Sequence, residues 1–152
     1  MLSLRLIQLI ETHSDLLTEN LLGTLGSAPE CADLLKIPPG HLRARAHEIY
    51  RNLADCLIGE TGAEIARRYT ALGIERAGQG VALSHVVWAI HATKRNLWTF
   101  LEREGLADNP IELNRSLELL ALLDRFFDTA IYFVAVGYER YHSGHIWNSC
   151  VE

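Results

Sequence analysis

The end of the chain holds a grouping of side chains whose spacing could bind a metal ion. His142 and His145 stand three residues apart, Glu139 precedes His142 by three, and Cys150 follows. A di-iron site in a helical bundle needs two Glu-x-x-His motifs and further carboxylates. The sequence offers that motif once in this region, at residues 139–142. We therefore predict that no metal is bound here.

Two further histidines, His85 and His91, lie in one expected helix. They are six residues apart, which places them on different faces of that helix, so they cannot hold one ion together. The pairs His85/His91 and His142/His145 nevertheless carry the alternative interpretation, a helical sensor that binds haem or a metal.

The sequence offers no pairing of a nucleophile with a base. Ser84 precedes His85, but no glycine-flanked serine turn would present its hydroxyl. Cys56 falls near the end of an expected helix, where a free cysteine is usually an apolar core residue. Phosphate-binding glycine loops follow a strand, and we expect no strand. We predict that the chain is not an enzyme and that it carries no cofactor.

Aromatic residues could instead line a cavity for a small apolar effector. Trp88 and Trp98, with His91 between them, lie broadly along one side of an expected helix, and Tyr69 lies on the helix before it. These four residues are our candidate ligand pocket. The same spacing also fits ordinary core packing, and both interpretations stay open.

Composition limits the class of protein. With 152 residues, 49% of them hydrophobic and 22% charged, the chain fits one domain, residues 1–152, with a core of its own. The net charge of −5 is spread over mixed signs, which argues against nucleic acid as a partner. Three widely spaced cysteines argue against a secreted disulfide framework. Charged residues interrupt the most apolar stretch, so we expect a cytoplasmic protein without membrane insertion.

Helical periodicity runs through almost the whole chain. We expect helices over residues 2–25 (with a break near 12–15), 41–58, 61–78, 84–104 and 110 to at least 141. Between the first two, Pro29, Pro38 and Pro39 predict an irregular stretch. Thr61 and Glu64 have the spacing of a capping box, and Ser84 is the expected N-cap of the fourth helix.

The last helix has two apolar arcs. The first is the expected core face and comprises Leu113, Leu117, Leu120, Phe127, Ile131, Val134 and Tyr138. The second comprises Leu119, Leu122, Phe126, Ala130, Phe133 and Gly137. One domain does not easily bury both, so we predict that the second arc is the interface of a homodimer. Burial of the second arc under the chain's own first helix is the alternative.

A family resemblance extends over about two thirds of the chain, from residue 44 to residue 141. The residues that carry it are Arg45-Ala46-His47-Glu48-Ile49-Tyr50-Arg51-Asn52-Leu53, Arg68-Tyr69, Gly73, Arg76-Ala77, Gln79-Gly80-Val81, Leu83-Ser84, Val86-Val87-Trp88-Ala89, Asn96-Leu97-Trp98, Phe100-Leu101, Glu102-Arg103-Glu104-Gly105-Leu106, Leu123-Asp124-Arg125-Phe126-Phe127-Asp128 and Gly137-Tyr138-Glu139. In order and spacing they resemble the non-haem globin-like sensor domain at the N-terminus of RsbR-type stress-response regulators and some sensor histidine kinases.

This resemblance implies an all-α, globin-like bundle of about five to six helices that dimerises and signals to a kinase or a stressosome-type scaffold. A haem globin needs a proximal histidine, yet no histidine lies between Glu48 and Ser84, and the corresponding position falls near Glu75. The resemblance therefore implies a bacterial input domain without haem, controlled by an unidentified small effector or by dimer geometry. The sequence does not distinguish a fused output domain from a separate one.

Overall fold

Over the residues that the structure describes, the chain consists of helices joined by turns and short loops, without strands. The computed structural model describes the backbone of residues 4–53, 55–59, 61–104 and 110–151, and the side chains of these residues except 58 and 145–151. The elements in order are α1 (Leu4–Thr12), α2 (Ser14–Ser27), the 3-10 helix η1 (Pro29–Lys36), α3 (Pro39–Arg51), the π-helical turn η2 (Asp55–Gly59), α4 (Gly62–Gly78), α5 (Leu83–Glu104) and α6 (Pro110–Val151). The predicted all-α class is confirmed, with slightly more helices than the five to six expected.

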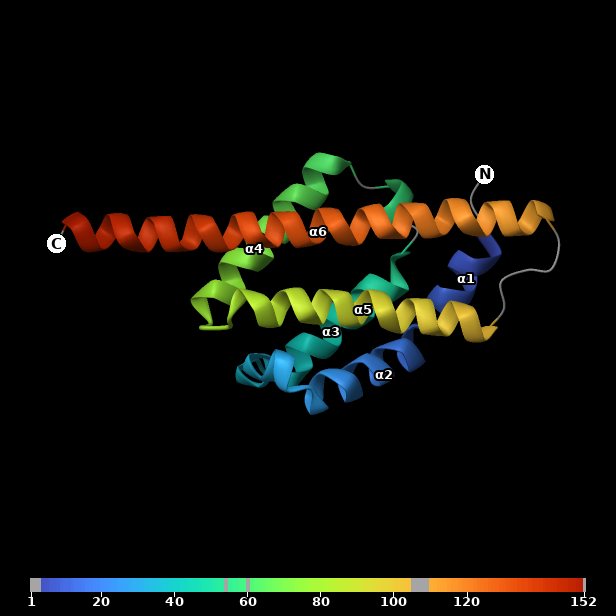
Figure 1. The fold of residues 1–152 in the computed structure, drawn as a ribbon, viewed down its shortest axis with the longest axis horizontal. Helices are drawn as coiled ribbons and strands as arrows, with labels where there is room; N and C mark the ends of the chain where they lie inside the picture. The colour runs from blue at the N-terminus through green and yellow to red at the C-terminus, as the bar shows by residue number, and fades with distance from the viewer. Residues whose placement is uncertain (1–3, 54, 60, 105–109, 152) are drawn as a thin grey trace.

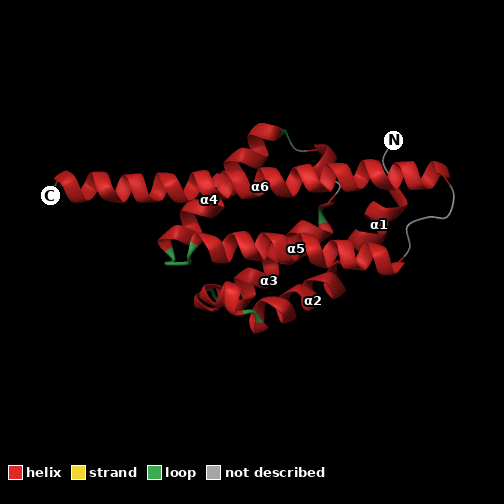
Figure 2. Cartoon of the chain, viewed as in Figure 1, coloured by secondary structure: helices red, strands yellow, loops and turns green. Residues whose placement is uncertain are grey.

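Figure 1 shows α6 running along one side of the molecule, with α5 beside it in the opposite direction. The helices α2 and α3 lie on the far side of α5, and α4 crosses between α6 and the rest of the body. The described loops, drawn in green in Figure 2, are short. The α4–α6 pair makes the most extensive contact between two elements. Helix α6 therefore rests mainly on α4, and its carboxyl end extends beyond the other helices (Figure 1).

Two glycines decide how α4 and α6 cross. A Cβ built on Gly137 would overlap the carbonyl oxygen of Thr70 and approach the Cα of Gly73 to 2.9 Å. A Cβ on Gly73 would in turn overlap the carbonyl oxygen of Val134. The backbones of the two helices thus touch directly, which only residues without a side chain allow. This contact selects the face of α6 that turns inward.

The inward face of α6 differs from the predicted core face. Phe127, Val134 and Tyr138 are buried as expected, but Leu113 and Leu117 are 40% and 53% exposed. Most of the second predicted arc is buried instead, because its member Gly137 is the residue that meets α4. The buried members of that arc are Leu119, Phe126, Ala130 and Gly137. The predicted core face is therefore confirmed from Phe127 to Tyr138 and wrong at Leu113 and Leu117, and the second arc shares the core with it.

Several helix boundaries follow the predicted local signals. The first helix breaks at His13, whose Nδ1 lies 2.8 Å from the carbonyl oxygen of Leu9, before α2 begins at Ser14. The Thr61 capping box is present, since the Thr61 hydroxyl accepts from the Glu64 N–H and the Glu64 carboxylate accepts from the Thr61 N–H. These bonds satisfy two otherwise unpaired groups at the start of α4.

Other boundaries depend on contacts that are distant in sequence. The stretch after Ser27, expected to be irregular, forms η1, and the second helix ends at Arg51 rather than near residue 58. Ser84 is not the N-cap of α5, because the Ala82 carbonyl already accepts from the His85 N–H. The Ala82 N–H itself donates to Asp33 Oδ2 at 2.9 Å. A carboxylate from η1 therefore stabilises the start of α5.

The buried apolar residues form one cluster that includes residues of every α-helix. Its largest fully buried side chains include Tyr50, Leu97, Leu101, Leu119 and Leu123. Over the described ranges, no helix combines the length and the apolar character that crossing a bilayer requires.

Candidate functional site

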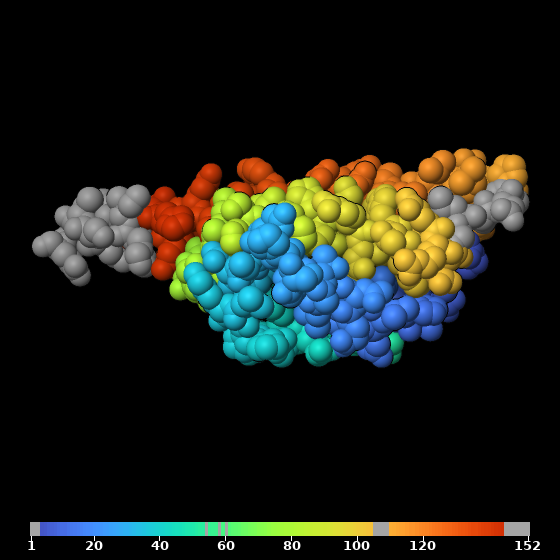
Figure 3. All heavy atoms as spheres, turned by 60° about the horizontal axis from the view of Figure 1, so that its bottom comes forward, coloured from blue at the N-terminus to red at the C-terminus, as the bar shows by residue number. Residues whose placement is uncertain are grey.

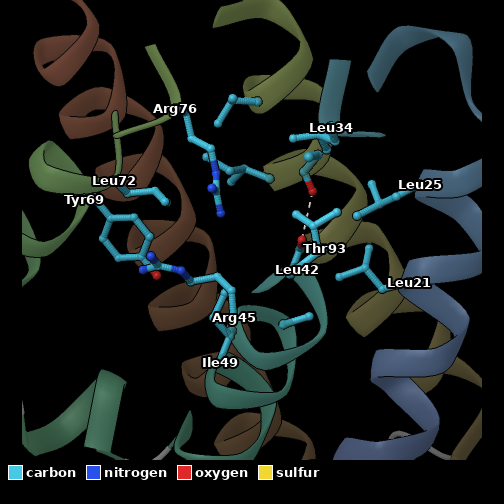
Figure 4. A pocket seen from close by; sticks show the side chains of 14 residues that line it. Leu21, Leu25, Leu34, Leu42, Arg45, Ile49, Tyr69, Leu72, Arg76 and Thr93 are labelled. Carbon is cyan, nitrogen blue, oxygen red and sulfur yellow. Dashed lines mark hydrogen bonds between the residues drawn. The ribbon is translucent and has the colours of Figure 1, made fainter. Parts of the chain in front are cut away.

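A cavity of about 90 Å³ lies where α2, η1, α3, α4 and α5 meet (Figure 4). Its lining is mostly apolar and combines residues that are far apart in sequence. These are Leu21, Leu25, Leu34, Leu42, Arg45, Ala46, Ile49, Tyr69, Leu72, Arg76, Val86, Ala89, Ile90 and Thr93. A concave apolar site with a few converging polar groups is the usual form of a small-molecule site.

Arg76 is the most unusual residue in this wall. It sits in the last turn of α4 and is only 4% exposed. Its Nη1 donates to Gln79 Oε1 at 2.8 Å and lies 3.9 Å from Glu75 Oε1. Burial, which disfavours the charged form, is the main cause that lowers the pKa of Arg76, and nearby Arg45 acts in the same direction. The guanidinium stays charged because an arginine pKa is far above neutrality.

Arg45 supplies a second guanidinium from α3. Figure 4 shows Arg45 and Arg76 reaching the cavity from opposite sides. The Arg45 Nη2 lies 3.4 Å from Glu75 Oε2, and both side chains are partly exposed. One carboxylate, Glu75, therefore contacts two arginines at the rim. No aspartate or glutamate belongs to the cavity lining itself, so the site has an excess of positive charge.

Tyr69 completes the polar side of the cavity. It is 5% exposed, and burial raises the pKa of its hydroxyl well above the ordinary value. Its ring packs edge-on against Phe126 of α6 at 5.8 Å between centroids. Tyr69, Gly73 and Arg76 lie on successive turns of α4, so the helix that lines the cavity is also the helix that touches α6.

Of the four residues predicted to line a ligand pocket, one lies at this cavity. Tyr69 lines it, whereas Trp88, His91 and Trp98 do not. Trp88 and Trp98 are partly buried, His91 is exposed, and Lys94 lies over the Trp98 ring at 5.4 Å.

The two arginines were missed by sequence reasoning, although α4 carries a signal for Arg76. The buried positions of that helix are Tyr69, Thr70, Leu72, Gly73, Arg76 and Ala77. Arg76 therefore occupies the inward face at helical spacing, where a charged residue is rare unless it is paired or functional. Arg45 offers no comparable signal, because its helix has a mixed pattern and its role depends on where α3 packs.

The histidines of the alternative interpretation lie apart from this cavity. His85 Nδ1 accepts the Asp33 N–H at 3.1 Å, and His91 is exposed on another face of α5. His142 is exposed next to Tyr141, while the side chains of His145 and Cys150 lie outside the described part. Within the described residues, no three histidine, cysteine, aspartate or glutamate side chains form a group suited to a metal ion.

The six residues of the predicted dimer interface divide into two groups. Leu119, Phe126, Ala130 and Gly137 are covered by the chain's own helices, and Leu122 and Phe133 are partly exposed. Among the described side chains of α6, the exposed large apolar residues are Ile111, Leu113, Leu117 and Tyr132. These exposed residues mark the apolar surface of α6 that a partner could reach.

Comparison with known proteins agrees with the resemblance seen in the sequence. The family model described as the RsbT co-antagonist protein rsbRD N-terminal domain matches residues 14–148. No curated protein and no solved structure matches the chain. The match covers most of the described helices, including the cavity and the α4–α6 crossing. The chain therefore belongs to the family of RsbT co-antagonist protein rsbRD N-terminal domains, which are stressosome-related sensor domains.

Proposed function

We propose that the chain is a cytoplasmic input domain that forms a homodimer and passes a signal to a kinase or a stressosome-type scaffold, without haem and without catalysis. The observation that carries this proposal is α6. It is one continuous helix of 42 residues, about 63 Å long at the usual rise per residue. It contacts the cavity-lining helix α4 at Gly137 and then extends past the body (Figure 1). A shift of α4 would therefore be carried to the far end of α6.

The outer face of α6 is the surface that we propose for the homodimer. Leu117 and Tyr132 are 53% and 63% exposed there, and Tyr132 packs edge-on against the partly exposed Phe133 at 5.0 Å. Of the interface predicted from the sequence, Leu122 and Phe133 are partly exposed on another side of α6, about 140–160° around the helix from Leu117. Aromatic residues at the centre of an interface often contribute most of its binding energy. The output partner, fused or separate, would then read the geometry of the paired helices.

Sedimentation analysis tests this seam with a matched control. The double variant Leu117→Glu, Tyr132→Glu should be monomeric where the unchanged chain is dimeric at micromolar concentration, and its circular dichroism should be unchanged because both side chains point outward. Leu35→Glu is the control, since Leu35 is 70% exposed on η1, which Figure 3 places on the face away from α6. A monomeric unchanged chain, or a double variant that stays dimeric, would contradict the proposed seam.

Absorption spectroscopy tests the part of the proposal that concerns haem. The chain is expressed in iron-replete cells and purified without added haem. We expect no Soret band, because the residue at the corresponding proximal position, Glu75, is partly exposed and lies within contact distance of Arg45 and Arg76. A Soret band that is lost in His85→Ala or His91→Ala would establish the alternative function instead.

A further inference from the structure

Three hydrogen-bond donors face the cavity without a matching acceptor. The Nε and Nη2 groups of Arg76 have no hydrogen-bond partner among the described residues, and neither does the Tyr69 hydroxyl. Arg45 makes one long contact, 3.4 Å to Glu75. Buried polar groups in native proteins are nearly always satisfied, so donors left without acceptors call for an explanation. A bound acceptor is the simplest one.

The charges around the cavity set the charge of that acceptor. Arg45 and Arg76 contribute two positive charges, and Glu75 at the rim contributes one negative charge. Arg68 and Glu48, which also act on Tyr69, have opposite charges and offset each other. The difference, two minus one, leaves one positive charge. A monoanion balances it, whereas a phosphate dianion would leave an uncompensated negative charge in an apolar wall, which is strongly unfavourable.

The remaining walls of the cavity indicate the polarity and size of the part of the ligand that lies away from the arginines. Leu21, Leu25 and Leu42 close the side opposite the arginines (Figure 4). Thr93, which lies beside them, already donates its hydroxyl to the Ala89 carbonyl at 2.8 Å, so this wall favours an apolar part of the ligand. The cavity measures about 90 Å³, less than the roughly 150 Å³ of an engineered cavity that binds benzene. A tail of a few carbon atoms fits this space.

We propose that the cavity binds a short aliphatic carboxylate of about three to five carbon atoms, its carboxylate held by Arg76, Arg45 and Tyr69 and its tail among the leucines. This inference rests on the proposed function, because it names the chemical class of the effector. Planar guanidinium groups match a carboxylate in geometry and charge. Arg76 and Tyr69 flank Gly73 on α4, so the ligand engages the helix one turn from its contact with α6.

Isothermal titration calorimetry on the 152-residue chain tests the chemistry with butyrate as the probe. Butyrate should bind with a dissociation constant on the order of 10 µM to 1 mM, as expected for a ligand of this size. Butyramide has the same shape without the charge, and inorganic phosphate has charge without a tail. Both should bind at least about tenfold more weakly than butyrate. Ionic strength is held constant with sodium chloride.

Two substitutions that each remove one positive charge test whether butyrate binds at this cavity. Arg76→Met should weaken butyrate binding by about tenfold or more, because it removes the charged donors. Arg43→Met is the control: Arg43 lies on α3 and pairs with Glu19, away from the cavity lining. It should change the dissociation constant by less than about twofold. Arg45→Met, at a more exposed position, provides the same test if Arg76→Met does not fold.

Several results would overturn the proposal. One is the absence of any heat of binding when butyrate is added to the folded chain. Another is butyramide or phosphate binding as tightly as butyrate. A third is a loss of butyrate affinity in Arg43→Met equal to that in Arg76→Met. Sedimentation of the same samples reports whether the chain is dimeric, so that butyrate binding and dimerisation are tested separately. A dimer that ignores butyrate would contradict the ligand alone, and a monomer that binds butyrate would contradict the dimer alone.

Discussion

At the scale of single residues, Gly137 lies at a direct backbone contact between α6 and α4. Replacing it with alanine would push a methyl group into the Thr70 carbonyl and the Gly73 backbone. Overpacking of this kind costs about 1–3 kcal/mol, and here neither neighbour is a flexible side chain. We expect Gly137→Ala to lower the free energy of unfolding by at least that amount in urea denaturation.

Gly144→Ala is the matched control on the same helix, because a Cβ there meets nothing within 4 Å. It should be neutral or raise helix stability by up to about 1 kcal/mol. Equal stability of both variants would show that α4 and α6 do not approach as closely as described.

Tyr138 connects α6 to the turn between α4 and α5. Its hydroxyl donates to the Val81 carbonyl at 2.7 Å, and burial raises the pKa of Tyr138 to about 12. The unfolded chain releases this proton near pH 10. Its contribution to stability is therefore complete below about pH 10 and is lost as the pH rises toward 12.

Tyr138→Phe removes both effects. We expect it to lower the free energy of unfolding at pH 7 by about 0.5–1.5 kcal/mol. Between pH 10 and 12 the variant should lose stability less steeply than the unchanged chain. Tyr50 and Tyr69 titrate in the same direction in both proteins, so the difference between the two curves isolates Tyr138. Parallel curves would contradict the assigned role.

At the scale of elements, the start of α5 depends on Asp33 of η1. Asp33 Oδ2 accepts the Ala82 N–H, and this bond is the main cause that lowers the pKa of Asp33, with Lys36 and His85 acting in the same direction. A carboxyl with a lowered pKa stabilises the fold above its ordinary value of about 3.9. That stabilisation is lost as the pH falls through the lower folded value.

Asp33→Ala should therefore be less stable than the unchanged chain at pH 7, and Asp33→Asn should lie between them because it keeps an acceptor but not the charge. The difference between the unchanged chain and Asp33→Asn should begin to shrink as the pH falls below about 3.9 and continue to shrink toward the lower folded value. Thermal unfolding followed by circular dichroism across pH 2.5–7 checks this. A difference that is the same at pH 2.5 as at pH 7 would mean that the charge is not the cause.

At the scale of the whole molecule, the single apolar cluster predicts single-step unfolding. Residues of every α-helix contribute to that cluster, so no helix has a core of its own. Chains of this size with one core usually unfold in one transition. Urea curves from tryptophan fluorescence and from circular dichroism should coincide. Separate midpoints would show that the long α6 or the α2–α3 layer unfolds independently.

Local signals in the sequence determined the helical elements. The Thr61 capping box, the break near His13 and the long last helix depend on residues within one or two turns, so they could be predicted correctly. The order of the family residues likewise identified the family that the comparison confirmed. Periodicity also showed that α6 has two apolar arcs, because the angular position of each residue follows from helix geometry alone.

Tertiary structure decided which arc of α6 is inside and where the cavity lies. The two arcs are nearly equal in apolar character, and the close backbone contact between Gly73 and Gly137 fixes which side of α6 faces α4. The buried side combines Phe126 and Ala130 of one arc with Phe127, Val134 and Tyr138 of the other. Arg45 and Arg76 lie 31 positions apart in sequence and meet because α3 packs near the end of α4. Such convergence depends on how helices cross, and crossing angles depend on side chains from both partners at once.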